Sequence, residues 1–450
     1  MTQDGWLKPR RYAVKYSSRA GSFLINIQNV GSTSIPGLPA KPILDFSIGV
    51  EDMANLVSLI SSLSQMGYID RGLGPGSIGS VRGVRMNTRE LFHAIMNFQE
   101  PDRTPVWLVE IITGQAERKW CRDEGFPLDK SGTDVLKFDS SLLTVNIGEQ
   151  PPIPTFPQKT VSEDDRYLVT QDVFGFTKQA PRDSSIAPTH YIYTGAPLNS
   201  IDDWREMRKR YDPSDARRYP IDWSDETFAH LNRSEKPASF GMNWGPARGI
   251  KNGYMFGFDR FLEIIALEPE ILEEVFDFWV GFLITFLGTF IDKLKVDAFY
   301  FKEDGMGFKN STLVSPEAFR RVYSPYMRKV VDYLRSKGVG VIGYYSSGNL
   351  KPLLPSFLDI GINAITPVEC AADMDAVTLR KEYPELLMTG GISRAAIMNG
   401  RSAIREDVGR KVPFLMEQGG FIPAFDDMVM PDMRFEDVKY CLDLIRSVWK

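Results

Sequence analysis

The chain has 450 residues, 43% hydrophobic and 25% charged, which is typical of a globular protein with one large domain and a smaller one. Its net charge of −5, with Lys and Arg spread along the sequence, argues against the basic face of a nucleic-acid-binding protein. Three scattered cysteines argue against a disulfide framework, and no apolar run reaches the roughly 20 residues of a membrane-spanning helix. We therefore expect a cytoplasmic protein with neither a nucleic-acid nor a membrane partner. The sequence gives no indication of the oligomeric state.

Residues 1–86 differ in character from the rest and predict a small α/β segment. A string rich in Gly, Ser and Pro, Gly31–Asp45, runs into an apolar strand, Phe46–Val50. Apolar residues follow a helical spacing in Asp52–Met66, and the Gly/Ser-rich Gly72–Ser80 indicates a loop or linker.

The string that ends at Asp45 closely resembles the signature of the GrpB-like family, which has a small nucleotidyltransferase-like fold. The resemblance implies that Gly31 and Ser32 approach a phosphate group and that Asp45 binds a metal ion. However, Asn29 stands where the family has a histidine, and Ser47 replaces its second metal carboxylate. We therefore interpret residues 1–86 as a truncated remnant or packing module, with nucleotide transfer as the weaker alternative.

The pattern changes from Asn87 onward, and the elements that follow alternate between helix and strand. Thr88–Met96 predicts a helix capped by Thr88, and Pro105–Ile112 predicts a first strand. Residues 151–178 are rich in Pro and β-forming residues around a polar turn, which predicts an inserted antiparallel hairpin.

A second group of elements precedes the repeated strands. Ala238–Gly245 predicts a strand, and the Gly-rich run Gly249–Gly257 after it fits no phosphate motif and is interpreted as a barrel loop. Long helices are expected at residues 259–266, 269–294 and 316–337, the last with Ser315 as N-cap.

Between Val296 and Asp427, an apolar strand-like run five times ends on small, polar or acidic residues and leads into a helix. This alternation predicts an α/β fold with a parallel sheet, often closed into a barrel, with its chemistry at the carboxyl ends of the strands. The five ends are Phe299–Gly305, Val341–Gly348, Ala364–Glu369, Leu387–Gly391 and Phe421–Asp427.

The motifs of this barrel, in their order, resemble the uroporphyrinogen decarboxylase superfamily. That resemblance implies that residues 87–450 form a (β/α)8 TIM barrel. It also implies a cofactor-free decarboxylation of porphyrinogen acetate groups, or methyl transfer between corrinoid proteins and thiols that are held by zinc. The motifs that carry it are Arg89–Val106, Ser315–Phe319 with Pro325–Tyr326, Pro367–Glu369 with Met374–Asp375, Gly390–Ser393, and Gly419–Pro423 followed by Asp426.

Neither implied site is intact in this sequence. The arginine-containing string that holds porphyrinogen carboxylates survives only in Gln115, Ala116 and Arg118, and Glu110 beside it would repel an acidic substrate. The zinc site needs a His-x-Cys where this chain has Tyr344–Gly348, so we expect no metal site and no tightly bound cofactor.

The residues that remain are carboxylates and polar groups at the strand ends, and neighbouring carboxylates raise one another's pKa as a general acid requires. We predict a tetrapyrrole-linked or other small-molecule substrate and, most favoured, methyl transfer with a corrinoid that a partner protein presents. A porphyrinogen-type decarboxylase and a non-catalytic ligand- or partner-binding barrel are the alternatives. The predicted catalytic residues are Asp304, Glu369, Asp426 and Glu303, and the predicted substrate-binding residues are Tyr345, Ser347, Asn349 and Arg118.

Overall fold

The computed structural model describes residues 85–127, 129–142, 150–182, 191–220 and 223–449, and the backbone of three further strands at 24–29, 46–50 and 145–146. The chain divides into two compact units, Met1–Arg85 and Met86–Lys450. In the first unit, β1 (Leu24–Asn29) pairs with β2 (Phe46–Val50) in antiparallel fashion. The predicted helix at 52–66, and Gly31, Ser32 and Asp45, lie outside the described residues.

The second unit is built on a parallel sheet whose strand order returns to its starting point. The two edges of the sheet are β4 (Ser140–Ser141), paired with β3, and β5 (Val145–Asn146), paired with β10. Because these edges are consecutive stretches of chain, the sheet has the connectivity of a closed eight-stranded barrel, as predicted. The other strands are β3 (Trp107–Leu108), β10 (Ser239–Asn243), β11 (Ala298–Lys302), β12 (Val341–Tyr345), β13 (Ala364–Val368), β14 (Leu387–Ile392) and β15 (Phe421–Phe425).

The five repeated strands are confirmed, and burial explains why they were visible in the sequence. Strands of a parallel barrel are covered on both faces, so they read as continuous apolar runs. All residues of β13, β14 and β15 are buried, whereas β10, β11 and β12 are buried up to their last residue. The strands β4 and β5 were not predicted, because each is only two residues long and β4 consists of two serines.

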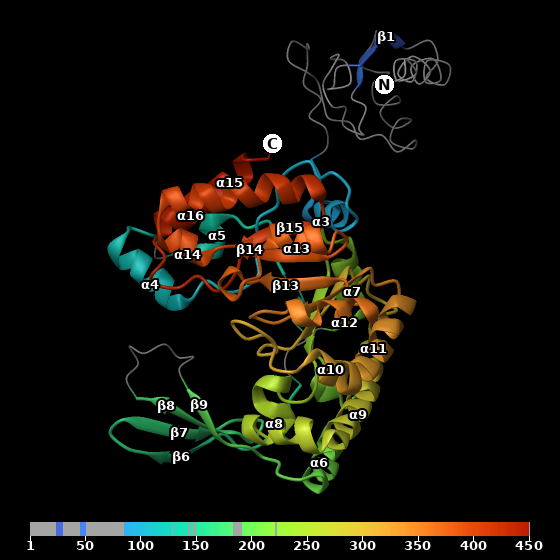
Figure 1. Ribbon diagram of the computed structural model, residues 1–450, viewed down its shortest axis with the longest axis vertical. Helices are drawn as coiled ribbons and strands as arrows, with labels where there is room; N and C mark the ends of the chain where they lie inside the picture. Colours follow the sequence, from blue (N-terminus) through green and yellow to red (C-terminus); the bar gives the residue numbers. More distant parts are fainter. Residues whose placement is uncertain are drawn as a thin grey trace. The chain divides into compact units, whose positions relative to one another are not determined.

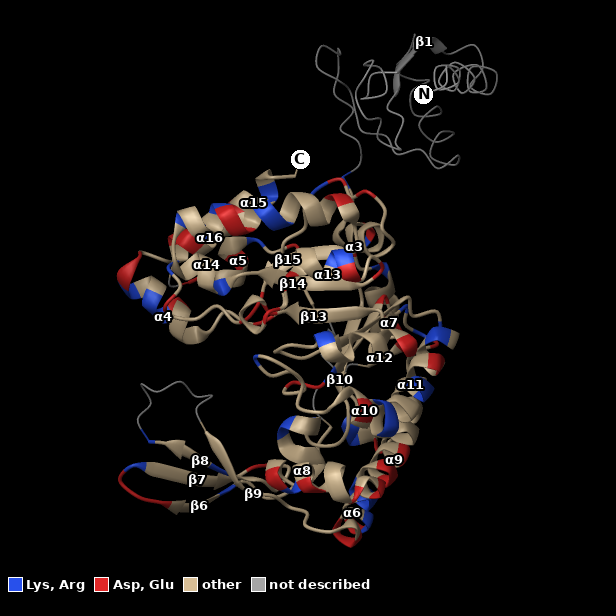
Figure 2. Ribbon diagram, in the orientation of Figure 1, with Lys and Arg blue, Asp and Glu red and all other residues tan. Residues whose placement is uncertain are grey.

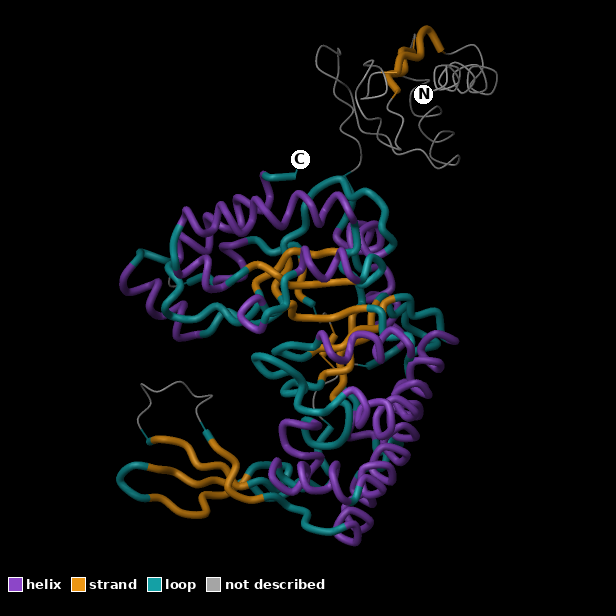
Figure 3. The backbone as a smooth tube through the Cα atoms, viewed as in Figure 1, coloured by secondary structure: helices purple, strands orange, loops and turns teal. Residues whose placement is uncertain are grey.

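Helices pack around this sheet, and Figure 3 shows them above and to the right of the strands. Helix α3 (Thr88–Met96) has the predicted bounds, but its N-cap is Asn87 rather than Thr88, because Asn87 accepts from the backbone N–H of Glu90 in a capping box. Helix α9 (Pro269–Gly288) ends six residues earlier than predicted. No helix among the described residues is long and apolar enough to cross a membrane.

The helix predicted at 316–337 is in fact three consecutive pieces. Ser315 caps α10 (Pro316–Ala318) as predicted, but the π-helix η7 (Phe319–Tyr323) separates it from α11 (Ser324–Ser336). Single π-turns often occur where a side chain is turned toward a site. Here the π-turn carries Tyr323, which is completely buried and hydrogen-bonded to a second tyrosine.

The predicted insertion is antiparallel, but it is a four-stranded sheet rather than a hairpin. Strands β6 (Lys159–Glu163), β7 (Tyr167–Gln171), β8 (Thr177–Pro181) and β9 (Ile192–Gly195) pair in sequence order. The sheet lies at the lower left of Figure 1, beyond the end of α8 (Phe258–Leu267). Since it is inserted after the second barrel strand, it belongs to the carboxyl-end face of the barrel.

Candidate active site

Strand register places three side chains side by side at the carboxyl end of the barrel. Asn243, Lys302 and Tyr345 are the last residues of β10, β11 and β12, and each is the register partner of the next. They are also the residues of these strands that are not fully buried, so they mark the barrel mouth. The ammonium group of Lys302 lies over the ring of Tyr345, 5.8 Å from its centroid.

Glu110 enters this group from the other side of the barrel, two residues after β3. The hydroxyl of Tyr345 donates a hydrogen bond to Glu110 Oε1, across 235 residues of sequence. The pKa of Glu110 is raised from 4.5 to about 7. Burial is the largest cause, and the charges of Asp304 and Asp427, which raise the pKa, outweigh those of Lys302 and Lys251, which lower it. A carboxylic acid that titrates near neutral pH is suited to donate and accept a proton.

The charged side chains around Glu110 comprise two ion pairs and one further cation, Lys302. Asp304 lies 3.4 Å from the ammonium of Lys251, and both side chains are about half exposed. Asp427 accepts from Arg394 at 2.6 Å. Figure 2 shows acidic positions at the left-hand ends of β13 and β14. The mutual raising of pKa that the sequence predicted thus acts on Glu110, which was not among the predicted catalytic residues.

The structure places Glu303 apart from this group, with no exposed surface. Its carboxyl accepts from the backbone N–H of Ile250 at 2.6 Å and from the hydroxyl of Tyr254 at 3.0 Å. Tyr254 in turn is hydrogen-bonded to Tyr323 at 3.0 Å. Burial raises the pKa of Glu303 well above its usual range. This placement favours an uncharged anchor for the loop after β10 over contact with a substrate.

Glu369 and Asp426 also bind backbone rather than other side chains of the mouth. Glu369 accepts from the N–H of Gly348 at 2.6 Å, which fixes the turn after β12. Asp426 is 3% exposed and accepts from Arg394 N–H at 2.8 Å and Cys370 N–H at 3.1 Å, and burial raises its pKa. Both carboxylates therefore hold the loops that carry the mouth residues.

The remaining predicted substrate-binding residues are dispersed. Asn349 is buried, and its Oδ1 accepts from the N–H of Lys351 at 3.0 Å, which makes it part of a turn. Ser347 is half-buried in the same turn, and its carbonyl accepts from Ser346 Oγ. Arg118 is exposed on α4 (Gly114–Asp123) and lines a surface concavity of about 530 Å³. Of the eight predicted residues, the structure brings Asp304 and Tyr345 together around Glu110.

Three residues of the mouth escaped the sequence prediction, although each stands at or just after the end of a strand. Glu110 was interpreted only as a repelling charge, but a group with a pKa of about 7 is only partly ionised at neutral pH, so that repulsion is weaker. Lys302 and Asp427 stand within the strand ends that were quoted. Their position at the strand ends was the signal in the sequence that could have identified them. The raised pKa that distinguishes Glu110 depends on distant segments of the chain and could not be predicted.

The described residues contain no group of three or more His, Cys, Asp or Glu side chains arranged to hold a metal ion. Cys370, near the mouth, contacts Lys411 instead, with its Sγ 3.2 Å from the ammonium nitrogen. Burial raises the pKa of the Cys370 thiol to about 12, so it is not a ready metal ligand or nucleophile.

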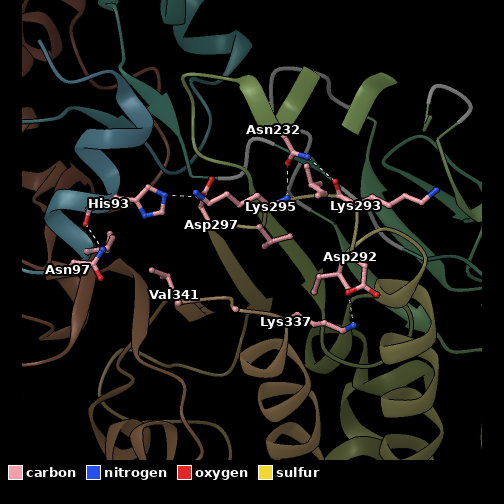
Figure 4. Close-up of a pocket in the computed structure, with 15 residues that line it drawn as sticks. His93, Asn97, Asn232, Asp292, Lys293, Lys295, Asp297, Lys337 and Val341 are labelled. Carbon is pink, nitrogen blue, oxygen red and sulfur yellow. Dashed lines mark hydrogen bonds and ion pairs between the residues drawn. The ribbon is translucent and has the colours of Figure 1, made fainter. Parts of the chain in front are cut away.

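The opposite end of the barrel has a concavity of about 520 Å³, shown in Figure 4. Its walls include His93, Asn232, Lys295 and Asp297, close to where β11 begins. The carboxylate of Asp297 is completely buried and binds His93 Nε2 at 2.8 Å, Arg89 Nε at 2.9 Å and a backbone N–H at 2.7 Å. In TIM barrels, this end serves stability rather than catalysis, and these paired groups fit that role.

Comparison with known proteins agrees with both predicted resemblances. Residues 250–448 match the family model of uroporphyrinogen decarboxylase, and residues 9–120 match that of the GrpB protein. Both resemblances are therefore confirmed for the residues matched. The GrpB match extends past residue 86, across α3 and α4, which the structure places in the second unit.

Two curated relatives resemble a short part of this chain. A UPF0157 protein of Halalkalibacterium halodurans is 40% identical over 58 residues, which is 13% of this chain and 30% of that protein. A UPF0157 protein of Streptomyces coelicolor is 38% identical over 52 residues, 12% and 28% of the two chains. The chain thus spans less than a third of these relatives. A solved methyltransferase from Methanosarcina mazei aligns with 80% of this chain and 98% of its own, at 14% identity and a TM-score of 0.48.

Proposed function

We propose that the barrel is an enzyme in which Glu110 transfers a proton to or from a substrate bound at the mouth. The observation that carries this proposal is the position of Glu110, with its pKa near 7, a hydrogen bond from Tyr345 and the cation of Lys302 on the neighbouring strand. When Glu110 gives up its proton, the hydroxyl of Tyr345 and the charge of Lys302 stabilise the resulting carboxylate.

The reaction that we favour is methyl transfer involving a corrinoid carried by a partner protein, which would supply or accept the methyl group. A heteroatom that loses its methyl group keeps the bonding electron pair, and protonated Glu110 would give that atom a proton. The residues of the rim fit such a ligand: Ile111 and Phe308 are 60% and 58% exposed in the loops after β3 and β11. Exposed apolar side chains beside a charged centre suit the apolar face of a large ring.

Decarboxylation is the second candidate, and Lys302 favours it. The ammonium of Lys302 would hold a substrate carboxylate at the mouth, and Glu110 in its protonated form would not repel it. After carbon dioxide leaves, Glu110 would protonate the carbon atom that keeps the electron pair. No redox cofactor is required for this step.

A direct test mixes the full chain with methylcobalamin and a thiol that accepts its methyl group, or with uroporphyrinogen, and follows the visible spectrum or the release of carbon dioxide. Glu110→Gln keeps the acceptor for Tyr345 but has no exchangeable acid proton, so we expect at least about a 100-fold loss of turnover. The matched control is Glu385→Gln, an exposed residue outside the mouth. Equal rates in the two variants would contradict the role of Glu110, and no binding of either probe would favour the non-catalytic barrel.

A further inference from the structure

A second group of charged and aromatic side chains lies where the antiparallel sheet meets the loop after β10. Lys178 and Tyr193 are register partners on β8 and β9, and Tyr191 lies two residues before Tyr193, so all three share one face of the sheet. The ammonium of Lys178 lies 5.1 Å from the ring centroid of Tyr191 and 5.4 Å from that of Tyr193. Asp172 accepts from Lys178 at 2.8 Å.

The loop after β10 supplies two more cations to the same place. Arg248 Nη1 lies 3.5 Å from the hydroxyl of Tyr191, and its guanidinium lies 5.9 Å from the ring of Phe174. Lys251 follows three residues later and is exposed. The charges of three cations from two separate segments thus act on Tyr191, and one of them, Arg248, contacts its hydroxyl.

The backbone that presents Arg248 is strained and held in place. Ala247 and Arg248 both have positive φ, at 50° and 71°, a backbone conformation that is unfavourable for residues other than glycine. The buried carboxyl of Glu303 binds the N–H of Ile250 just beyond them and anchors the loop. Strain of this kind persists where the surroundings fix it, and it clusters at ligand-binding sites.

The electrostatics at Tyr191 agree with a positive potential. Burial by itself raises the pKa of the Tyr191 hydroxyl, but a hydrogen bond from Tyr193 and the charges of Lys178, Arg248 and Lys251 outweigh burial and lower it. The pKa of Tyr193 is raised, because burial and the neighbouring Tyr191 both disfavour its ionisation. The same potential that favours a tyrosinate favours any bound anion.

We infer that Tyr191, Lys178, Arg248 and Lys251 form a subsite that binds an anionic group, a carboxylate or a phosphate, of the molecule processed at the barrel mouth. Lys251 connects the two places, since its charge acts on Tyr191 and also on Glu110, and it pairs with Asp304 at the mouth. This inference rests on the proposed function for the identity of the bound molecule. It adds that the substrate extends from Glu110 toward the antiparallel sheet and carries negative charge at that end.

The test titrates the full chain by the ultraviolet absorption of tyrosinate and subtracts the titration of Tyr191→Phe, which isolates Tyr191. Inorganic phosphate and succinate serve as probes, with chloride at equal ionic strength as reference. A bound anion opposes ionisation of the neighbouring hydroxyl, so we expect the pKa of Tyr191 to rise by about one at saturation. A rise with phosphate alone or with succinate alone tells which anion the subsite prefers.

Variants show which side chains are needed for the response of the Tyr191 pKa to anions. Arg248→Gln should abolish the response, Arg248→Lys should keep it by retaining the charge, and Arg118→Gln should leave it unchanged. A pKa of Tyr191 that is the same in phosphate, succinate and chloride would overturn the inference, as would loss of the response in Arg118→Gln but not in Arg248→Gln. Because this is an equilibrium measurement, it also works in Glu110→Gln, so failure of the proposed reaction and failure of the subsite are distinguishable.

Discussion

The two ends of the barrel each hold a buried carboxylate, and they treat it in opposite ways. At the end where β11 begins, burial disfavours ionisation of Asp297, but hydrogen bonds from His93 and a backbone N–H and the charge of Arg89 outweigh it and lower its pKa. At the mouth, Glu110 is also largely buried but has other carboxylates as neighbours, and its pKa rises to about 7. Because both carboxylates are largely buried, their partners decide whether the pKa is lowered, as in Asp297, or raised, as in Glu110.

Within one barrel, Asp297 contributes to stability, whereas Glu110 is suited to proton transfer. Asp297 is fully satisfied and ties α3 to the start of β11, so its ionised form contributes to folding. Glu110 has one hydrogen bond from Tyr345 and an incomplete set of partners, so its ionised form costs stability and keeps its proton available. Sites that carry function often hold groups that folding alone would not favour.

The largest expected effect is at Asp297. Replacing it with Ala leaves Arg89 buried without its partner, which should lower the free energy of unfolding by about 3–5 kcal/mol. Because its pKa is lowered in the folded state, the wild-type contribution is present above the unfolded-state pKa and is lost as the pH falls. Urea unfolding at neutral and at acidic pH measures both effects. An equal loss at all pH values would contradict the ionic role.

Glu110→Gln should act on stability in the opposite direction. The folded-state pKa of about 7 lies above the ordinary 4.5, so the free energy of unfolding of the wild type falls between these pH values. The variant should therefore be more stable than the wild type above pH 7, by up to about 3 kcal/mol, and similar to it below pH 4.5. Urea unfolding across this range measures the difference. A variant less stable at every pH would mean that Glu110 is a structural residue like Asp297.

Gly249→Ala tests whether the buried carboxyl of Glu303 anchors the loop after β10. Gly249 has a φ of 62°, and a Cβ there would collide with the carboxyl of Glu303. We expect a loss of about 1–3 kcal/mol and a loss of the anion response of Tyr191, because the loop that carries Arg248 would shift. Thermal unfolding and the tyrosinate titration measure these. Gly338→Ala, another positive-φ glycine with open space around it, controls for backbone strain alone.

The smallest expected effect on folding is that of Lys251→Met. Its ion pair with Asp304 is about half exposed on both sides, so its removal should change the free energy of unfolding by less than about 0.5 kcal/mol. Because Lys251 lowers the pKa of Glu110, the variant should raise that pKa further, and the pH at which stability falls should move upward. Carboxyl resonances followed by NMR against pH give this value directly. No change would place Lys251 outside the mouth.

The strands from β10 to β15 were predictable because each is covered on both faces and therefore reads as an apolar run. The strands β4 and β5 were not predictable, since each is only two residues long and β4 consists of two serines. The π-turn at Phe319–Tyr323 was not predictable either, because it leaves the helical pattern of its sequence intact. The inserted sheet was recognised by its first hairpin only. Its last strand follows a stretch without a strong alternating pattern.

The sequence by itself determined the α/β barrel, the resemblance to two families and the end of the barrel at which a site is expected. These follow from hydrophobic periodicity, from the order of the motifs and from strand position. Only the tertiary structure showed which carboxylate at the strand ends has a pKa near neutrality. The pKa of Glu110 depends first on its burial and then on the charges of Asp304 and Asp427, which lie about 200 and 300 residues away in the sequence. The same folding buries Glu303 and turns it into a loop anchor, although the two residues are the same amino acid at equivalent strand ends.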